Sequence, residues 1–168
     1  MFLAVHTAGG ILISQYVKQP IGLFVVSFLS HYLIDIIPHG DEGIDRWIKK
    51  KPSRLLLVEA IDISLIIVFI SLFLHNNPQA NTMLLLVAVF GAVLPDFLAE
   101  GYYQITTRSA PFYRLFFFIR KSNLILAPLY QHKALHHRIH KTFNIEISTY
   151  AGLLLQLVFL VAFGILSM

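Results

Sequence analysis

The chain has 168 residues, of which 57% are hydrophobic and only 13% are charged, and its mean hydropathy is +0.70. A soluble domain of this size carries about 25% charged residues. The composition therefore excludes a disordered chain and argues against a free globular enzyme. The sequence has no cysteine, which excludes disulfides, thiolate zinc sites and cysteine nucleophiles. Any metal ion must be held by His, Asp and Glu.

Apolar stretches follow one another along the chain. A helix of about 20 residues crosses roughly 30 Å of hydrocarbon, and five stretches approach or reach this length: residues 2–17, 21–37, 55–74, 83–99 and 147–167. Short polar turns separate the first from the second and the third from the fourth. In the first stretch, Gly9 and Gly10 allow a neighbouring helix to approach closely. We predict an all-α integral membrane bundle of about five transmembrane helices, in which residues 1–168 form a single membrane domain.

The basic residues orient this bundle. Of the 13 Lys and Arg residues, 12 lie in the connections 40–54 and 101–146, and only Lys18 lies elsewhere. By the positive-inside rule these two connections face the cytoplasm. The prediction is a multi-pass protein of the inner membrane with its N-terminus inside and its C-terminus outside. Because the positive charge serves orientation, we expect no nucleic-acid partner.

The long connection 101–146 contains two further apolar pieces. Residues 111–119 are strongly aromatic and are followed by Arg120 and Lys121, as expected of a segment that lies in the membrane interface or re-enters the membrane. Residues 123–130 form a second such piece. We predict an interfacial helical connection between the last two spans.

Ionisable residues occur inside the predicted spans, where they are costly and usually functional. His31, Asp35 and His39 are spaced four apart in the second span and share one helical face. Pro38 lacks a backbone N–H and ends or bends the helix there, so His39 is expected to approach from the turn.

The other ionisable residues fall near the same predicted membrane surface. His6 opens the first span, Glu59 and Asp62 open the third, and Asp96 and Glu100 close the fourth. The cytoplasmic connection then adds four histidines, of which the first, second and last share a face if the segment is helical: His132, His136, His140, and beside them His137. Five separate pieces of chain thus deliver acids and imidazoles to one side of the membrane.

Metal binding is the chemistry that fits this convergence. Imidazole and carboxylate suit Zn, Mn, Fe or Mg, and more than four candidate ligands are consistent with one to three divalent ions, Zn being the first expectation and Mn or Mg the others. A carboxylate between two histidines can bridge two cations or orient an imidazole. The predicted metal ligands are His6, His31, Asp35, His39, Asp62 and Asp96.

Structural roles are the alternative for several of these residues. His6 can be an interfacial residue at a helix end, and Glu59 with Asp62 can stabilise a helix N-terminus. His132 to His140 can form a solvated amphipathic stretch that lies on anionic lipid. His31 with Asp35 can form a buried structural hydrogen bond.

Three strings, SHYLIDIIPHGD, GAVLPDFLAE and HHRIH, resemble motifs of the membrane-bound metal-dependent hydrolase family typified by the bacterial inner-membrane protein YdjM. In that family a histidine opens the first helix, a Pro-Asp pair ends a later helix, and an HR-plus-His motif follows in a loop. The resemblance implicates His6, Asp96 and the cluster from His136 to His140 around Arg138. The first string is also similar to the HxxxD helix of zinc-dependent phospholipase C, which implicates His31, Asp35 and His39.

The function predicted from these observations is a membrane-embedded metal-dependent hydrolase at the inner leaflet, with a lipid-linked phosphoester as substrate. The predicted catalytic residues are Glu100, His136 and His140 as acid or base, and Arg138, which would neutralise phosphate charge. The alternatives are a metal-ion transporter or a membrane metal-binding protein without hydrolase activity. A transporter is disfavoured because alternating access needs sites near the midplane. A haem protein with two axial histidines is disfavoured by the carboxylates. The oligomeric state stays open.

Overall fold

The computed structural model describes residues 2–40, 52–107, 110, 113–116, 118–143, 145 and 147–167. These residues form α-helices, one short 3₁₀ turn and no strand, which confirms the predicted all-α class. The elements in chain order are α1 (Leu3–Tyr16), α2 (Pro20–Asp35), α4 (Pro52–Asn76), α5 (Thr82–Thr106), η1 (Ile119–Lys121), α6 (Asn123–His140) and α7 (Thr149–Ser167). The connection 40–54 lies almost entirely outside the described residues.

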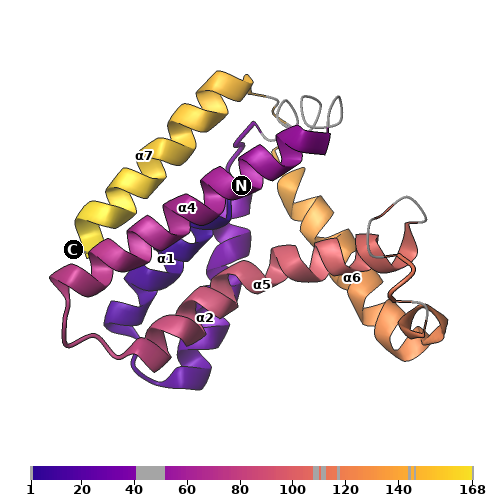
Figure 1. The fold of residues 1–168 in the computed structure, drawn as a ribbon, viewed down its shortest axis with the longest axis horizontal. Coiled ribbons are helices and arrows are strands. Elements are labelled where there is room, and N and C mark those ends of the chain that lie inside the picture. Colours follow the sequence, from indigo (N-terminus) through magenta and orange to yellow (C-terminus); the bar gives the residue numbers. More distant parts are fainter. Residues whose placement is uncertain are drawn as a thin grey trace.

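Helix α1 forms the centre of the bundle and contacts α2, α4, α5 and α7 (Figure 1). Small residues make this packing possible. A Cβ added at Gly10 would lie 2.8 Å from the backbone oxygen of Ala88 in α5. At Gly91 of α5, a Cβ would lie 2.8 Å from the backbone oxygen of Phe24 in α2. The predicted close approach at Gly10 is therefore confirmed, and it brings α1, α2 and α5 together.

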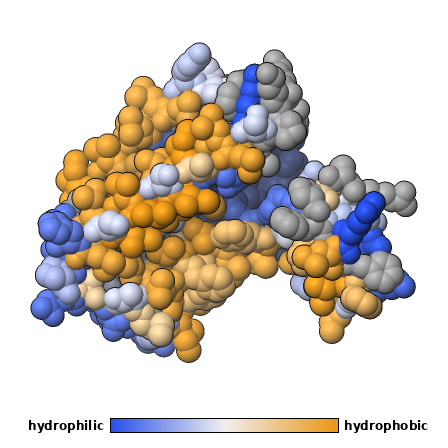
Figure 2. Space-filling view, in the orientation of Figure 1, coloured by the Kyte–Doolittle hydropathy of each residue, from blue (hydrophilic) through white to orange (hydrophobic). Residues whose placement is uncertain are grey.

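Three helices are long and apolar enough to cross a membrane: residues Leu56–Asn76, Thr82–Thr106 and Thr149–Ser167. Pro20–Asp35 is a shorter apolar helix. With 14 and 16 residues, α1 and α2 are about 21 and 24 Å long at 1.5 Å per residue. Apolar side chains cover the outer face of α4 and α7 (Figure 2). These features suggest a membrane protein in which the short helix α1 is enclosed by its neighbours, whereas one face of α2 is exposed.

Helix α5 continues to Thr106, beyond the predicted end of its span at residue 99, and α6 packs on this extension (Figure 1). Residues 123–130, predicted as a separate interfacial piece, form the first half of α6. The predicted aromatic segment 111–119 is described only in part, since residues 111, 112 and 117 lie outside the described ranges. The fold thus carries the histidines of α6 back to the bundle.

Candidate metal centre

The centre begins with two buried polar residues in an otherwise apolar helix. His31 and Asp35 lie one turn apart on α2 and are 0% and 1% exposed. Helix α2 ends at Asp35, three residues before Pro38, because a residue before proline is disfavoured in the helical conformation. His39 therefore lies beyond the helix end, as the sequence suggests, and its side chain is also buried.

The carboxylate of Asp35 lies among four imidazole rings. Its Oδ1 is 3.2 Å from His6 Nε2. Its Oδ2 is 3.0 Å from His31 Nε2, 3.3 Å from His136 Nε2 and 3.0 Å from His140 Nε2. These rings come from α1, α2 and α6, so one side chain joins three helices.

Asp96 of α5 adds a second carboxylate. Its Oδ1 is 3.2 Å from His136 Nε2 and 3.7 Å from His31 Nε2. His31 Nε2 and His136 Nε2 are themselves 3.1 Å apart. Residues 61 positions apart in sequence, Asp35 and Asp96, thus share imidazole partners, which confirms the prediction that they face each other across the bundle.

Two sets of side chains have ligand atoms within 4.8 Å of one another and can hold a metal ion. The first group is His31, Asp35, Asp96 and His136, and the second group is Asp35, His39 and His140. Asp35 belongs to both. The described part of the chain therefore contains a His/Asp cluster that can bind metal, in which Asp35 is common to both groups.

Five of the six ligand pairs in the first group lie at about the separation found around a tetrahedral ion. Metal–nitrogen and metal–oxygen bonds of about 2.0–2.1 Å separate neighbouring tetrahedral ligands by about 3.3–3.4 Å. The ligand atoms of the first group are separated by 3.0 to 3.7 Å in the pairs His31–Asp35, His31–Asp96, His31–His136, His136–Asp35 and His136–Asp96. The side chains present therefore fit a small divalent ion.

Backbone carbonyls orient two of the histidines. His31 Nδ1 donates to Ala92 O at 2.8 Å, and His39 Nδ1 donates to Ile37 O at 2.7 Å. A histidine that donates one ring N–H to a carbonyl presents the lone pair of its other nitrogen, which is the usual arrangement of a metal ligand. One histidine in each group, His31 in the first and His39 in the second, is therefore oriented in this way.

Helix α6 presents three of its four histidines on one face, as the four-residue spacing predicts, while His137 is exposed. His136 and His140 reach Asp35, whereas His132 Nε2 donates to Pro95 O at 2.8 Å and its Nδ1 lies 3.1 Å from the Tyr32 hydroxyl. His132 therefore anchors α6 to α2 and α5 from outside both groups.

The surroundings shift the pKa values of these three histidines in different directions. Burial lowers the pKa of His132 and of His140, although hydrogen bonds to Pro95 and to Asp35 act in the opposite direction. Burial also lowers the pKa of His136, but the hydrogen bonds that its ring donates to the carboxylates of Asp35 and Asp96, together with their negative charge, outweigh burial and raise the pKa to about 9. A metal ion bound by His136 would displace a proton.

Two predicted metal ligands have other contacts. His6 is fully buried, stacks on His31 with ring centroids 3.9 Å apart, and touches the shared carboxylate from outside the two groups. Asp62 accepts from Leu3 N–H at 2.8 Å and Ala4 N–H at 2.9 Å. It caps the N-terminus of α1, whose first N–H groups lack helical partners. This role differs from the predicted one, and the acid stabilises a different helix from its own.

Two predicted catalytic residues lie outside the ligand groups. Glu100 is exposed and accepts from Gln104 Nε2 at 2.6 Å. Arg138 is exposed, and it lies two residues from both His136 and His140, which places it on the opposite side of α6 from their shared face. The described contacts thus give neither residue a place beside the carboxylates.

Gln156 is a buried polar residue that the sequence interpretation missed. It lies 1% exposed in the middle of α7, accepts from Phe2 N–H at 2.8 Å, and donates to His39 O at 3.1 Å. A single glutamine inside an apolar span is the signal that could have drawn attention to it, because such a side chain needs buried partners.

The centre opens on one side. The side chains of Asp96 and His140 are 27% and 26% exposed, whereas those of His6, His31 and Asp35 are fully buried. Figure 2 shows hydrophilic surface in the recess between α4 and the part of the molecule formed by α5 and α6. Access to the ligands is therefore from the side of α5 and α6.

No family model, no curated protein and no solved structure matches this chain. The resemblance to the YdjM-like hydrolases stays a prediction that rests on the three motifs.

Proposed function

We propose that the protein is a membrane-embedded metal-dependent hydrolase that acts on a lipid-linked phosphoester at the inner leaflet. The observation that carries the proposal is the sharing of Asp35 between two adjacent ligand groups. A pair of ions held there would supply an activated water at neutral pH and neutralise the charge of a phosphoryl group. Hydrolysis would form a bond from the water oxygen to phosphorus and break the bond to the leaving alcohol, which would take up a proton of the water.

The two groups support different roles. The first group offers four protein ligands, as structural metal sites do, whereas the second offers three, as catalytic metal sites do. The second group also contains the partly exposed His140. Asp35, His39 and His140 would hold the ion that activates the attacking water. His31, Asp96 and His136 would hold the other ion beside it.

Charge and position favour an anionic lipid substrate. Two divalent ions with the two carboxylates of Asp35 and Asp96 give a net charge of +2, which attracts a phosphate anion. The centre lies where the short helix α1 begins and the short helix α2 ends, and it meets the long helix α5 at Asp96, well inside that helix. Its placement at the headgroup depth of the inner leaflet is part of the proposal and rests on the positive-inside rule.

The test is hydrolysis by the purified full-length protein in detergent micelles with Zn, Mn or Mg. The probes are phosphatidic acid, a phosphomonoester, and phosphatidylglycerol, a phosphodiester, each compared with a water-soluble nitrophenyl ester. We expect metal-dependent release from one lipid probe and at least a 100-fold lower rate in Asp35→Asn. Binding of metal with no hydrolysis of any probe would favour the metal-binding alternative, and ion uptake into sealed vesicles would favour the transporter.

The inner-leaflet assignment is tested by single-cysteine labelling, which is unambiguous because the chain contains no cysteine. Cysteines placed in residues 45–52 and 120–142 are expected to react only from the cytoplasm, and those in residues 76–81 only from outside. The opposite pattern would overturn the orientation and place the centre at the outer leaflet.

A further inference from the structure

Helix α7 contributes no ligand to either group, yet it lies directly against the backbone of His39. A Cβ added at Gly152 would be 2.2 Å from His39 O and 2.9 Å from Gly40 Cα, distances that real side chains do not show. Gly40 itself has φ +73°, a conformation that favours glycine. Two glycines therefore allow the chain after α2 to pass against α7.

Gln156 lies one turn further along α7 and binds the same backbone. Its Nε2 donates to His39 O at 3.1 Å, while its Oε1 accepts from Phe2 N–H at 2.8 Å. The side chain is 1% exposed, so these bonds form away from water, where an unpaired polar group is costly. Gln156 thus ties the loop that carries His39 to the start of α1.

His39 needs such support because it lies outside a helix. The ligands His31, Asp96 and His136 are held by the regular backbones of α2, α5 and α6. His39 follows the end of α2 by four residues, and its ring is oriented locally by Ile37 O. The contacts with α7 fix its main chain, so they bear on the second group, and none of them involves His31, Asp96 or His136.

We infer that Gly152 and Gln156 are positioning residues that set the affinity of the second group for its metal ion by holding the backbone of His39. The inference rests on the proposed two-ion centre. It assigns α7 a role in the chemistry in addition to spanning the membrane. Outer contacts of this kind typically change metal affinity by about 10- to 100-fold.

The test compares Gly152→Ala and Gln156→Met with wild type and with Gly164→Ala. The two variants act by different means, since one adds a methyl group against His39 O and the other removes the hydrogen bonds of an equally long side chain. Gly164→Ala is the matched control on the same helix, because its Cβ would meet only the Phe69 side chain, at 3.5 Å. Zinc content by elemental analysis and stepwise affinity by chelator competition are the readouts.

We expect both variants to bind the first ion with unchanged affinity and the second about 10- to 100-fold more weakly, while Gly164→Ala behaves as wild type. If the wild type binds two ions, the inference alone is overturned when the variants bind both ions equally more weakly, or when they bind both with unchanged affinity. A wild type that binds fewer than two ions would overturn the two-ion centre and the inference with it.

Discussion

The two ends of the bundle satisfy their polar side chains in different ways. At the ligand end, where α1 begins and α2 ends, acids and imidazoles contact one another. At the turn end, which contains residues 14–19 and 77–81, polar side chains bind the ends of helices instead. Both ends place polar groups within an apolar bundle. The comparison therefore distinguishes polar side chains that stabilise helix ends from polar side chains that would bind a ligand.

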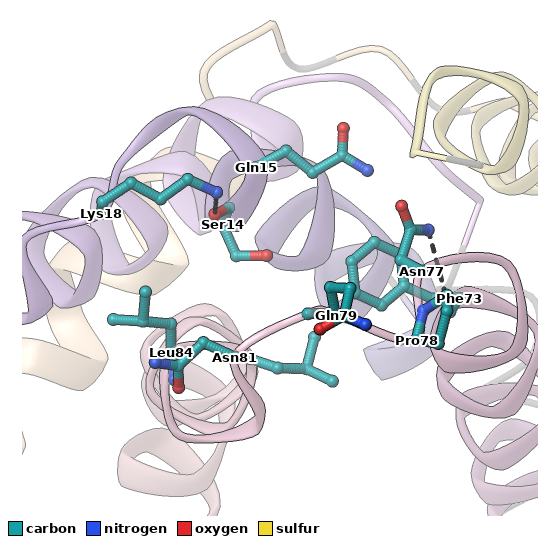
Figure 3. A pocket seen from close by; sticks show the side chains of 11 residues that line it. Ser14, Gln15, Lys18, Phe73, Asn77, Pro78, Gln79, Asn81 and Leu84 are labelled. Carbon is teal, nitrogen blue, oxygen red and sulfur yellow. Dashed lines mark hydrogen bonds between the residues drawn. The ribbon is translucent and has the colours of Figure 1, made fainter.

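At the turn end several polar side chains bind the backbone. Asn81 accepts from Met83 N–H and Leu84 N–H, Asn77 donates to Phe73 O, and Lys18 donates to Ser14 O. A cavity of about 640 Å³ lies among these residues (Figure 3), and none of its lining residues is His, Asp or Glu. Helix termini leave N–H and C=O groups unpaired, and these side chains supply the missing bonds.

At the ligand end only some of the polar side chains form hydrogen bonds with the backbone. Asp62 caps α1 as an amide would at the turn end. In contrast, the Nε2 atoms of His31 and His136 point at each other and at the same carboxylates. Such a cluster is balanced by protons or by metal ions, and the bridging position of Asp35 favours ions. Buried polar side chains that contact one another therefore indicate a binding site, whereas those that bind helix ends have a structural role.

The largest effect is expected from Asp35, which belongs to both groups. Asp35→Ala should remove both ions, because each group loses the ligand they share, and added metal should no longer raise the melting temperature. Asp62→Asn is the matched control, since it alters another buried aspartate but leaves both groups intact. It should lower stability while retaining both ions. Full metal occupancy in Asp35→Ala would reduce this cluster to a structural one.

A smaller effect is expected from Asp96, which belongs to the first group only. Asp96→Ala should release one ion and keep the other, and elemental analysis of the purified variant measures the ratio. Glu100→Gln, one turn further on α5 and exposed, should retain both ions. Loss of both ions in Asp96→Ala would mean that the two groups do not bind independently, and retention of both would exclude Asp96 as a ligand.

The smallest effect is expected at the turn end. Asn81→Ala removes the N-cap of α5 and should cost about 1 kcal/mol, which lowers the melting temperature by about 2–4 °C in a protein of this size. Metal content should stay at the wild-type value. A change in metal content on removal of this cap would contradict the separation of the two ends.

Much of the centre can be predicted from spacing alone. The four-residue intervals between His31 and Asp35, and between His136 and His140, place each pair on one face of a helix. The positive-inside rule predicts that the ends of α1, α2 and α5 meet at one surface. Apolar length predicts the helical spans, although the continuation of α5 to Thr106 lies beyond its apolar stretch.

Other features depend on tertiary contacts that no local pattern encodes. Asp62 has the residue type and position of a ligand, but the free N–H groups of α1 compete for its oxygens. Arg138 belongs to a suggestive motif, but helical geometry turns it away from His136 and His140. The partners of Gln156 lie 117 and 154 residues away, so its role becomes visible only when α7 is packed against the bundle.

The most direct test of the account is the number and position of metal ions in the wild-type protein. Anomalous scattering from crystals grown with zinc, supported by elemental analysis, should reveal two ions about 3.5–4 Å apart. One should lie among His31, Asp35, Asp96 and His136, and the other among Asp35, His39 and His140. Crystals with no anomalous peak beside Asp35, from protein that binds no stoichiometric metal in solution, would contradict the account.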